Sequence, residues 1–272
     1  MVKKVSIITV NLNNFEGLTR TMESVLSQTY TDYEYVIVDG GSTDGSREFI
    51  EKHADRLSYW CSEPDGGIYN AMNKAVTKAT GEYVCFMNSG DSLYSNTTLE
   101  DIFSQEQKAD ILFGDVYRSK NGEKLSIRTF PKHITTEQMF KGGITHQAIF
   151  SRRTLHIEHP YDERYKMIAD WFFLIHRLLD GCEFKHVGRI VCCFDITGYS
   201  CTTRTKNDIH EQQFYKAIDG MFPKPVQDDI NELIAIKKSD FSGIISLTAQ
   251  MGVKGKIISA LVKFISKLPS LK

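Results

Sequence analysis

Residues 33–45 read Tyr-Glu-Tyr-Val-Ile-Val-Asp-Gly-Gly-Ser-Thr-Asp-Gly, a pattern that indicates the fold class. An apolar run that stops at Asp39 is typical of a strand buried on both faces, and the glycines after it permit a tight turn. Other short apolar runs occupy residues 5–10, 83–87 and 111–116. Apolar residues at helical spacing between these runs predict helices over residues 18–26, 46–53 and 68–78. Strands that alternate with helices predict an α/β fold with a mainly parallel central sheet flanked by helices.

The composition is that of an ordinary globular protein. The chain has 272 residues, 41% of them apolar and 25% charged, which excludes wholesale disorder. With 33 basic against 34 acidic residues the net charge is −1, so nucleic acid is not an expected partner. The six cysteines form no C-x-x-C pair and the N-terminus shows no signal-peptide pattern, which together predict a reducing, cytoplasmic location.

Polar residues follow the predicted strands. Three asparagines follow the first strand within residues 11–14, the turn at residues 39–45 follows the second, and residues 88–92 (Asn-Ser-Gly-Asp-Ser) follow the strand at 83–87. Ligands of parallel α/β sheets bind beyond the carboxyl ends of the strands. We therefore expect these residues to share one polar crevice.

Two interpretations of the turn at residues 39–45 remain open on the residues alone. Asp39 at a strand tip and Asp44 near the next helix are suited to binding the hydroxyl or ring N–H groups of a nucleoside. They are equally suited to a solvated turn in which Asp44 is the N-cap of the helix. The segment is neither a G-x-G-x-x-G fingerprint nor a phosphate-binding loop, since no G-K-[ST] sequence follows it.

Asp91 and Asp170 are candidates for metal binding and for acid–base chemistry. A strand that runs into an acidic turn can present Asp91 to Mg²⁺ or Mn²⁺, although an isolated Asp more often forms an Asx-turn. Asp170 lies near the start of an apolar helix predicted over residues 167–179, where desolvation would raise its pKa and make it a usable base. The alternative for Asp170 is a carboxylate favoured by the helix dipole. His146 is either structural or part of a pocket.

Five stretches, taken in order, resemble the N-terminal half of family 2 glycosyltransferases. They are residues 5–11 (VSIITVN), 24–30 (SVLSQTY), 34–45 (EYVIVDGGSTDG), 62–73 (SEPDGGIYNAMN) and 81–84 (GEYV). The resemblance is close over residues 4–118 and looser to about residue 200. The whole looks like the bacterial branch that builds capsule, O-antigen or exopolysaccharide. This resemblance implies a GT-A fold, which is Rossmann-like, with a nucleotide-sugar donor bound by the N-terminal half.

The resemblance also implies roles for residues around the donor. In the family's pattern, Thr9 and Asn11 fall on positions that line the base and ribose pocket. Asp39 falls on the carboxylate that contacts the base or ribose. Asp44 and Asp65 fall beside the nucleotide.

The family's acidic metal motif is thinned in this chain. Asp91 aligns with its last acid, whereas Asn88 and Gly90 occupy the two other acidic positions. Asn88 still offers a carbonyl oxygen, but one carboxylate holds a cation less tightly than two or three. The resemblance therefore implies a divalent cation, Mg²⁺ or Mn²⁺, bound by Asp91. Asp170 resembles the catalytic base of inverting members, which removes the proton from the acceptor hydroxyl.

We expect a catalytic domain over residues 1–203 and a helical extension after it, over residues 204–272. Within the domain, residues 1–118 would bind the nucleotide sugar and residues 119–203 the acceptor. Residues 253–268 have the pattern of a basic amphipathic helix. Such a helix suits an anionic membrane surface, and packing on the domain with its lysines in water is the alternative.

The expected function is inverting transfer of a sugar from a nucleotide sugar, in the first instance a UDP-sugar, to a glycan acceptor carried on a lipid. A peripheral position on the inner face of the cell membrane would suit such an acceptor. A nucleotidyltransferase is disfavoured because the first loop lacks a basic, glycine-rich phosphate-binding sequence. A non-catalytic protein that binds nucleotide sugars, or a scaffold, stays open because the acidic motif is thinned.

Overall fold

The structure is a computed structural model that describes residues 3–140, 143–198 and 223–229. The chain divides into two compact units, Met1–Phe214 and Tyr215–Lys272. In the second unit, residues 224–229 are helical. The predicted domain boundary after residue 203 and the amphipathic segment predicted over residues 253–268 lie outside the described residues.

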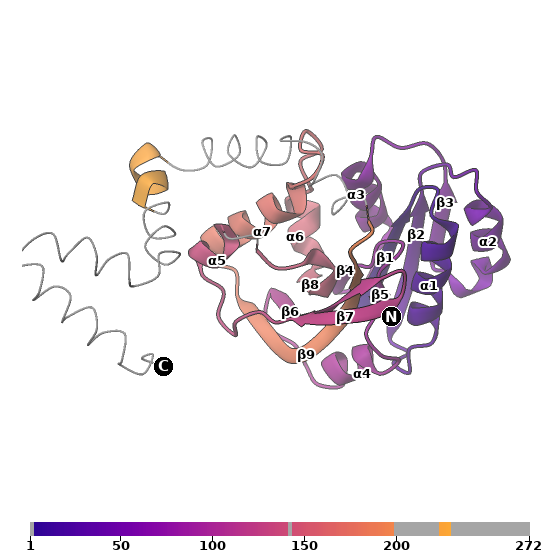
Figure 1. Ribbon diagram of the computed structural model, residues 1–272, viewed down its shortest axis with the longest axis horizontal. Helices are drawn as coiled ribbons and strands as arrows, with labels where there is room; N and C mark the ends of the chain where they lie inside the picture. The colour runs from indigo at the N-terminus through magenta and orange to yellow at the C-terminus, as the bar shows by residue number, and fades with distance from the viewer. Residues whose placement is uncertain (1–2, 141–142, 199–222, 230–272) are drawn as a thin grey trace, which may run out of the picture. The chain divides into compact units, whose positions relative to one another are not determined.

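The N-terminal half of the first unit alternates between strands and helices, as the sequence predicts (Figure 1). Its strands run parallel in the order β3-β2-β1-β4. They are β1 (Val5–Asn11), β2 (Tyr33–Asp39), β3 (Tyr59–Ser62) and β4 (Tyr83–Phe86). The connecting segments are α1 (Phe15–Leu26), α2 (Ser46–Lys52), the 3-10 turn η1 (Ala54–Arg56) and α3 (Ile68–Lys78). The three predicted helices of this half are thereby confirmed.

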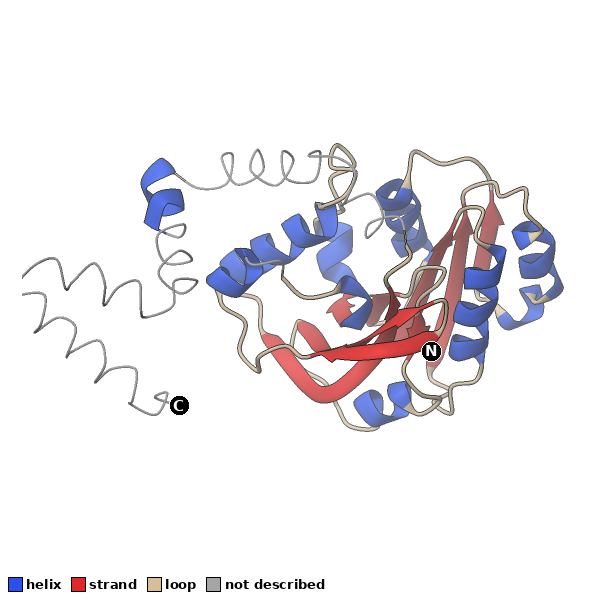
Figure 2. Ribbon diagram, in the orientation of Figure 1, coloured by secondary structure: helices blue, strands red, loops and turns tan. Residues whose placement is uncertain are grey.

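The second half adds strands of mixed direction to the same sheet (Figure 2). They are β5 (Ser92–Leu93), β6 (Ile111–Lys120), β7 (Glu123–Arg128), β8 (Ile149–Arg152) and β9 (Phe184–Asp195). Over the described residues the sheet has nine strands in the order β3-β2-β1-β4-β8-β6-β9-β5, with β7 paired to β6. The strand β8 is antiparallel to both of its neighbours, so the sheet is parallel in its first half and mixed beyond β4.

The helices of the second half lie between these strands along the chain. They are α4 (Thr98–Phe103), α5 (Thr136–Phe140), the 3-10 turn η2 (His146–Ala148), α6 (Arg153–Glu158) and α7 (Ala169–Leu179). The helix predicted over residues 167–179 corresponds to α7, which begins two residues later because Ile168 is its N-cap.

Helices cover both faces of the parallel strands, which is why β1 is buried along its whole length. Ile7 belongs to one hydrophobic core with Leu18 and Met22 of α1. Ile8 is equally buried and points to the opposite face, where α3 packs on β1 and β2. A sheet fixed on both faces gives the loops at its carboxyl edge defined positions.

Candidate active site

Three loops meet at the carboxyl edge of the parallel strands. The strands β1 and β2 end level with each other, because Asn11 pairs in register with Asp39. The loop after β4 reaches the same edge, since Asn14 donates from Nδ2 to the backbone oxygen of Ser89 at 3.1 Å. The polar residues that follow these strands in the sequence therefore lie together.

The Asp39 carboxylate is fully buried and accepts five hydrogen bonds. Its Oδ1 accepts from Asn11 Nδ2 at 2.7 Å and from Ser42 Oγ at 2.5 Å. Its Oδ2 accepts from Ser62 Oγ at 2.6 Å and from the backbone N–H groups of Gly41 and Ser42 at 3.2 and 2.9 Å. Burial acts to raise the pKa of Asp39, but these hydrogen bonds favour the charged form and hold its pKa below the usual value. Asp39 therefore fixes this turn as an ionised carboxylate.

Thr9 and Asn11 differ in what they present at this edge. Thr9 is fully buried, and its Oγ1 donates to the backbone oxygen of Met87 at 2.7 Å and lies 2.9 Å from the hydroxyl of Tyr35. Its hydroxyl is therefore used inside the protein, where it holds the start of the loop after β4. Asn11 instead has a buried Oδ1 with no hydrogen-bond partner among the described residues. That oxygen is free to accept from an N–H or O–H group of a ligand.

Asp44 and Asp65 lie on the loops that flank the end of β2. Asp44 accepts from the backbone N–H groups of Phe15 at 2.8 Å and Ser46 at 3.1 Å, so it joins the turn to the first residues of α1 and α2. Asp65 Oδ2 approaches Gly40 so closely that a Cβ on this glycine would stand 2.9 Å from it. Gly40 therefore lets the Asp65 carboxylate lie directly against the turn.

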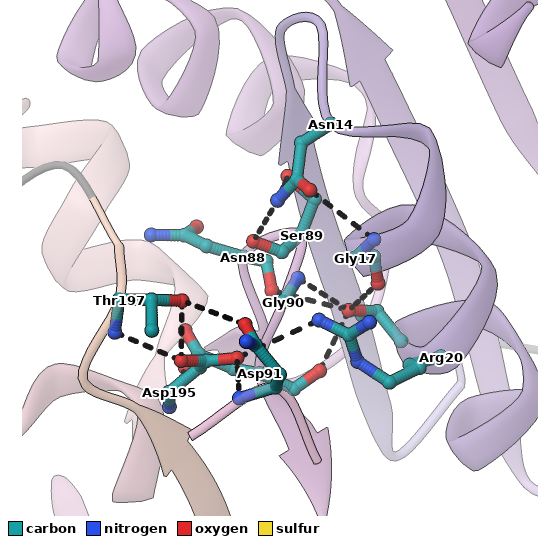
Figure 3. A network of polar contacts seen from close by, with 11 residues as sticks. Asn14, Gly17, Arg20, Asn88, Ser89, Gly90, Asp91, Asp195 and Thr197 are labelled. Carbon is teal, nitrogen blue, oxygen red and sulfur yellow. Dashed lines mark hydrogen bonds and ion pairs between the residues drawn. The ribbon is translucent and has the colours of Figure 1, made fainter. Parts of the chain in front are cut away.

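A network of hydrogen bonds fixes the loop at residues 88–91 (Figure 3). The Thr21 hydroxyl of α1 donates to the backbone oxygen of Asp91 at 2.6 Å and accepts from the Gly90 N–H at 3.0 Å. Gly90 has a φ of +107°, which residues with a side chain rarely adopt. The loop conformation therefore disfavours an acidic residue at position 90.

Asp91, the predicted metal ligand, is 5% exposed and joins this loop to β9. Its Oδ1 accepts from the backbone N–H of Asp195 and its Oδ2 from Gln147 Nε2, both at 2.8 Å. Burial raises the pKa of Asp91 to about 7 in spite of these bonds. Across the part of the chain that the structure describes, no group of three His, Cys, Asp or Glu side chains is arranged to hold a metal ion. The role of Asp91 as a metal ligand stays a prediction.

Asn88 presents the oxygen that fits a cation best. Its Oδ1 is buried and has no hydrogen-bond partner among the described residues, while its Nδ2 lies 3.2 Å from Nε2 of His146. An amide oxygen at a strand tip is a hard ligand of the kind that Mg²⁺ and Mn²⁺ take. The residues present are therefore compatible with a cation that is coordinated by Asn88 Oδ1 and by further oxygens of a bound anion.

Asp170 lies in the first turn of α7, and each of its carboxylate oxygens accepts a hydrogen bond. The Tyr69 hydroxyl donates to Oδ1 at 2.6 Å, and His146 Nδ1 donates to Oδ2 at 2.8 Å. The side chains of Asp170 and His146 are each 19% exposed, so the pair is only partly covered by the protein.

The expectation that apolar surroundings raise the pKa of Asp170 is wrong. Burial does act in that direction, but the hydrogen bond and charge of His146, with the hydrogen bond of Tyr69, hold the pKa of Asp170 below its usual value. Burial acts to lower the pKa of His146, and the Asp170 carboxylate outweighs it and raises that pKa. Asp170 is therefore ionised at neutral pH, as a general base must be.

The structure brings the predicted residues into two neighbouring groups, with Thr9 in the core beneath them. Asn11, Asp39, Asp44 and Asp65 surround the ends of β1 and β2, and Asn88, Asp91 and Asp170 lie around the loop after β4. Sequence reasoning missed four residues that organise these groups: Thr21, Tyr69, Gln147 and Asp195. Tyr69 lies inside one of the quoted family motifs, which was the available signal for it.

The sequence is similar to a known protein family and to curated proteins. The sequence model described as glycosyl transferase family 2 matches residues 6–158. A PGL/p-HBAD biosynthesis glycosyltransferase of Mycobacterium bovis is 37% identical over 221 residues, covering 78% of this chain and 83% of that protein. A cholesterol galactosyltransferase of Borreliella burgdorferi is 30% identical over 169 residues, covering 59% of this chain and 47% of that protein.

Solved structures share the fold at lower identity. TarS of S. aureus, residues 1–349 in complex with UDP-GlcNAc, has a TM-score of 0.62 at 20% identity over 84% of this chain and 70% of that chain. Full-length TarS is longer, and the match covers 36% of it. The mannosyltransferase PcManGT of Pyrobaculum calidifontis, in complex with GDP-Man and Mn²⁺, has a TM-score of 0.60 at 18% identity over 97% of this chain and 81% of that chain.

These neighbours are GT-A glycosyltransferases, which confirms the fold class expected from the sequence. The family match covers more than half of the chain, and the M. bovis relative extends the likeness to 78% of it. This chain therefore belongs to glycosyl transferase family 2.

Proposed function

We propose that this glycosyltransferase is an inverting enzyme that moves one sugar from a nucleotide sugar to a glycan acceptor. The observation that carries the proposal is the Asp170 carboxylate. It is ionised, its side chain is partly exposed, and two hydrogen bonds hold it beside the loop after β4. An ionised carboxylate that an acceptor hydroxyl can approach is suited to act as a general base.

The reaction we propose is a single displacement. Asp170 takes the proton of the acceptor hydroxyl, whose oxygen forms a bond to the anomeric carbon of the donor sugar. The bond between that carbon and the diphosphate breaks on the opposite face, and its electron pair leaves with the nucleoside diphosphate. Because attack and departure occur on opposite faces, the anomeric configuration inverts.

A UDP-sugar is the donor that we propose. The free Oδ1 of Asn11 would accept from the nucleoside, with the Asn11 amide oriented by its 2.7 Å hydrogen bond to Asp39. Thr9 would support this pocket from the core, and Asp44 and Asp65 would lie beside the nucleotide. The complexes of TarS with UDP and UDP-GlcNAc support a UDP-sugar, whereas PcManGT was solved with GDP-Man, so both nucleotides belong in the test.

We also propose a divalent cation, Mg²⁺ or Mn²⁺, at the loop after β4. Asn88 Oδ1 would hold it together with oxygens of the donor diphosphate, and Asp91 would join only by exchanging its bond to Gln147 or Asp195 for the cation. When bound, the cation would neutralise charge that develops on the leaving diphosphate. The Mn²⁺ in the PcManGT complex supports this proposal.

The acceptor that we propose is a glycan carried on a lipid, reached from the cytoplasmic face of the membrane. The Borreliella relative, a cholesterol galactosyltransferase, supports an acceptor of lipid character. None of the helices within the described residues is long and apolar enough to span a bilayer. Contact with the membrane would fall to the basic segment at residues 253–268, outside the described residues. The division into residues 1–118 for the donor and 119–203 for the acceptor stays part of this proposal.

A screen of nucleotide sugars tests the proposed function. We expect the full chain to release a nucleoside diphosphate from one UDP-sugar when a glycolipid acceptor is present, and chelation by EDTA to remove that activity. Asn88→Ala should raise the Mn²⁺ concentration that gives half-maximal rate by about tenfold, because the cation loses a protein ligand. Titration of Mn²⁺ by electron paramagnetic resonance in the presence of UDP should show the same weakening without turnover.

Ser89→Ala is the matched control for that variant, because it changes the neighbouring side chain of the same loop, and its Mn²⁺ dependence should equal that of the wild type. Unchanged Mn²⁺ affinity in Asn88→Ala would contradict the proposed cation site. Binding of nucleotide sugars without release or transfer, across UDP and GDP donors and both cations, would instead identify a non-catalytic nucleotide-sugar-binding protein.

A further inference from the structure

We propose that Tyr69 and His146 are positioning residues that hold the Asp170 carboxylate for proton transfer, an inference that rests on the function proposed above. The three residues come from α3, η2 and α7, which are far apart in the chain. The Tyr69 hydroxyl donates to Oδ1 at 2.6 Å and His146 Nδ1 donates to Oδ2 at 2.8 Å. Rotation of the Asp170 carboxyl group about its Cβ–Cγ bond would break both hydrogen bonds. Tyr69 and His146 together, here called the clamp, therefore select one orientation of the Asp170 carboxylate.

Tyr69 is built to be a permanent donor to this carboxylate. It is 6% exposed, and its ring packs against that of Tyr161 with the centroids 5.3 Å apart. Burial raises the pKa of the Tyr69 hydroxyl well above its usual value, so the hydroxyl keeps its proton. The buried Tyr69 hydroxyl donates its hydrogen bond to Asp170 Oδ1 and thereby fixes the position of that oxygen.

His146 orients two groups at once. An ionised carboxylate only accepts hydrogen bonds, so Nδ1 carries the proton that faces Asp170. The other ring nitrogen, Nε2, lies 3.2 Å from Asn88 Nδ2. This arrangement leaves Asn88 Oδ1 as the unpartnered atom of that amide. The imidazole therefore connects the orientation of the base to that of the amide at the tip of β4.

Substitutions that remove one contact at a time test the clamp. We expect Tyr69→Phe to lower kcat about tenfold with the donor KM unchanged, because a hydrogen bond to a charged group is lost at the base alone. His146→Ala should lower kcat about a hundredfold. Asparagine places its amide nitrogen where histidine has Nδ1, and glutamine places it where histidine has Nε2. His146→Asn should therefore recover more of kcat than His146→Gln.

Tyr161→Phe is the matched control for Tyr69→Phe, because it removes a hydroxyl from the neighbouring buried tyrosine. The Tyr161 hydroxyl forms no hydrogen bond with a described residue. Its kcat should stay within twofold of the wild type. Equal losses in both tyrosine variants, or equal recovery by asparagine and glutamine at position 146, would overturn the proposal. Thermal unfolding of each variant separates these outcomes from a failure to fold.

A spectroscopic readout keeps the clamp testable without turnover. In the full chain with ¹⁵N-labelled histidine, the protonated Nδ1 of His146, assigned by its loss in His146→Ala, should shift when Asp170 is changed to asparagine. A resonance that does not respond would overturn the contact. In a further outcome, the wild type consumes no donor while this shift still appears. That result would confirm the contact between His146 and Asp170, but it would overturn both the proposed function and the catalytic role of the clamp.

Discussion

Replacing Asp170 with asparagine is expected to lower the rate of sugar transfer by about 10²–10⁴-fold, the usual contribution of a general base, while UDP binds as in the wild type. The asparagine side chain has nearly the same shape, and its oxygen still accepts one of the hydrogen bonds that reach position 170. It has no basic lone pair, however, so the acceptor hydroxyl keeps its proton. Diphosphate release measures the rate, and calorimetric titration with UDP measures the binding.

Asp180→Asn provides the control for this substitution on the same helix. Asp180 is the C-cap of α7, and its side chain is 52% exposed and paired with Arg177. Transfer should be unaffected, because Asp180 lies at the opposite end of the helix from Asp170. Full transfer activity in Asp170→Asn would remove Asp170 from the mechanism.

Asp39→Asn is the second change for which we expect a large effect, this time on nucleotide binding. The carboxylate accepts five hydrogen bonds, and an amide in either orientation turns an NH₂ group toward donors that it cannot pair. Hydrogen bonds to charged groups contribute about 1.5–3 kcal/mol, so we expect the free energy of unfolding to fall by about 2–4 kcal/mol. The affinity for UDP should fall at least about a hundredfold, because the Asn11 amide loses its orientation.

Asp32→Asn tests whether any loss of charge around β2 has the same consequence. Asp32 directly precedes the strand, and its side chain is 54% exposed. Its substitution should change the free energy of unfolding by less than about 0.5 kcal/mol and leave UDP binding intact. Asp39→Asn with the wild-type affinity for UDP would show that the turn does not organise the nucleotide site.

The parallel half of the fold was predictable because its residues follow simple periods. Apolar runs such as residues 33–38 mark strands covered on both faces, and the spacing of Leu18, Met22 and Val25 marks the buried face of α1. Beyond β4 the strands change direction and β7 is exposed along its length, so the period of two carries less information there. The sequence of the mixed half therefore predicts separate short strands but not how they pair.

The candidate site was predictable in its residues but not in its contacts. Asp39, Asn88 and Asp170 stood out as polar groups at the ends of apolar runs. Nothing local to Asp170 indicates a hydrogen bond with Tyr69, which is 101 residues away in the chain. The direction of the pKa shift of Asp170 was missed for the same reason. Burial of Asp170 is visible in the sequence pattern, but its hydrogen bond with His146, which outweighs burial, is not.

Asp91 shows why a resemblance to a sequence motif does not fix the role of a side chain. Its position suggests a cation, yet both of its oxygens bond to groups at the far side of the loop, on β9 and η2. The neighbouring Asn88 instead carries the free oxygen. Only the three-dimensional arrangement separates an acidic side chain that shapes the loop from an amide whose oxygen has no hydrogen-bond partner among the described residues.

The configuration of the newly formed glycosidic bond distinguishes inversion from retention. With the donor found in the screen and its glycolipid acceptor, proton NMR of the product reports the anomeric coupling of the transferred sugar. Transfer from an α-linked UDP-sugar is expected to give the β-linkage alone, because the hydroxyl activated by Asp170 attacks opposite the leaving diphosphate. An α-linked product would mean retention of configuration and would contradict the account.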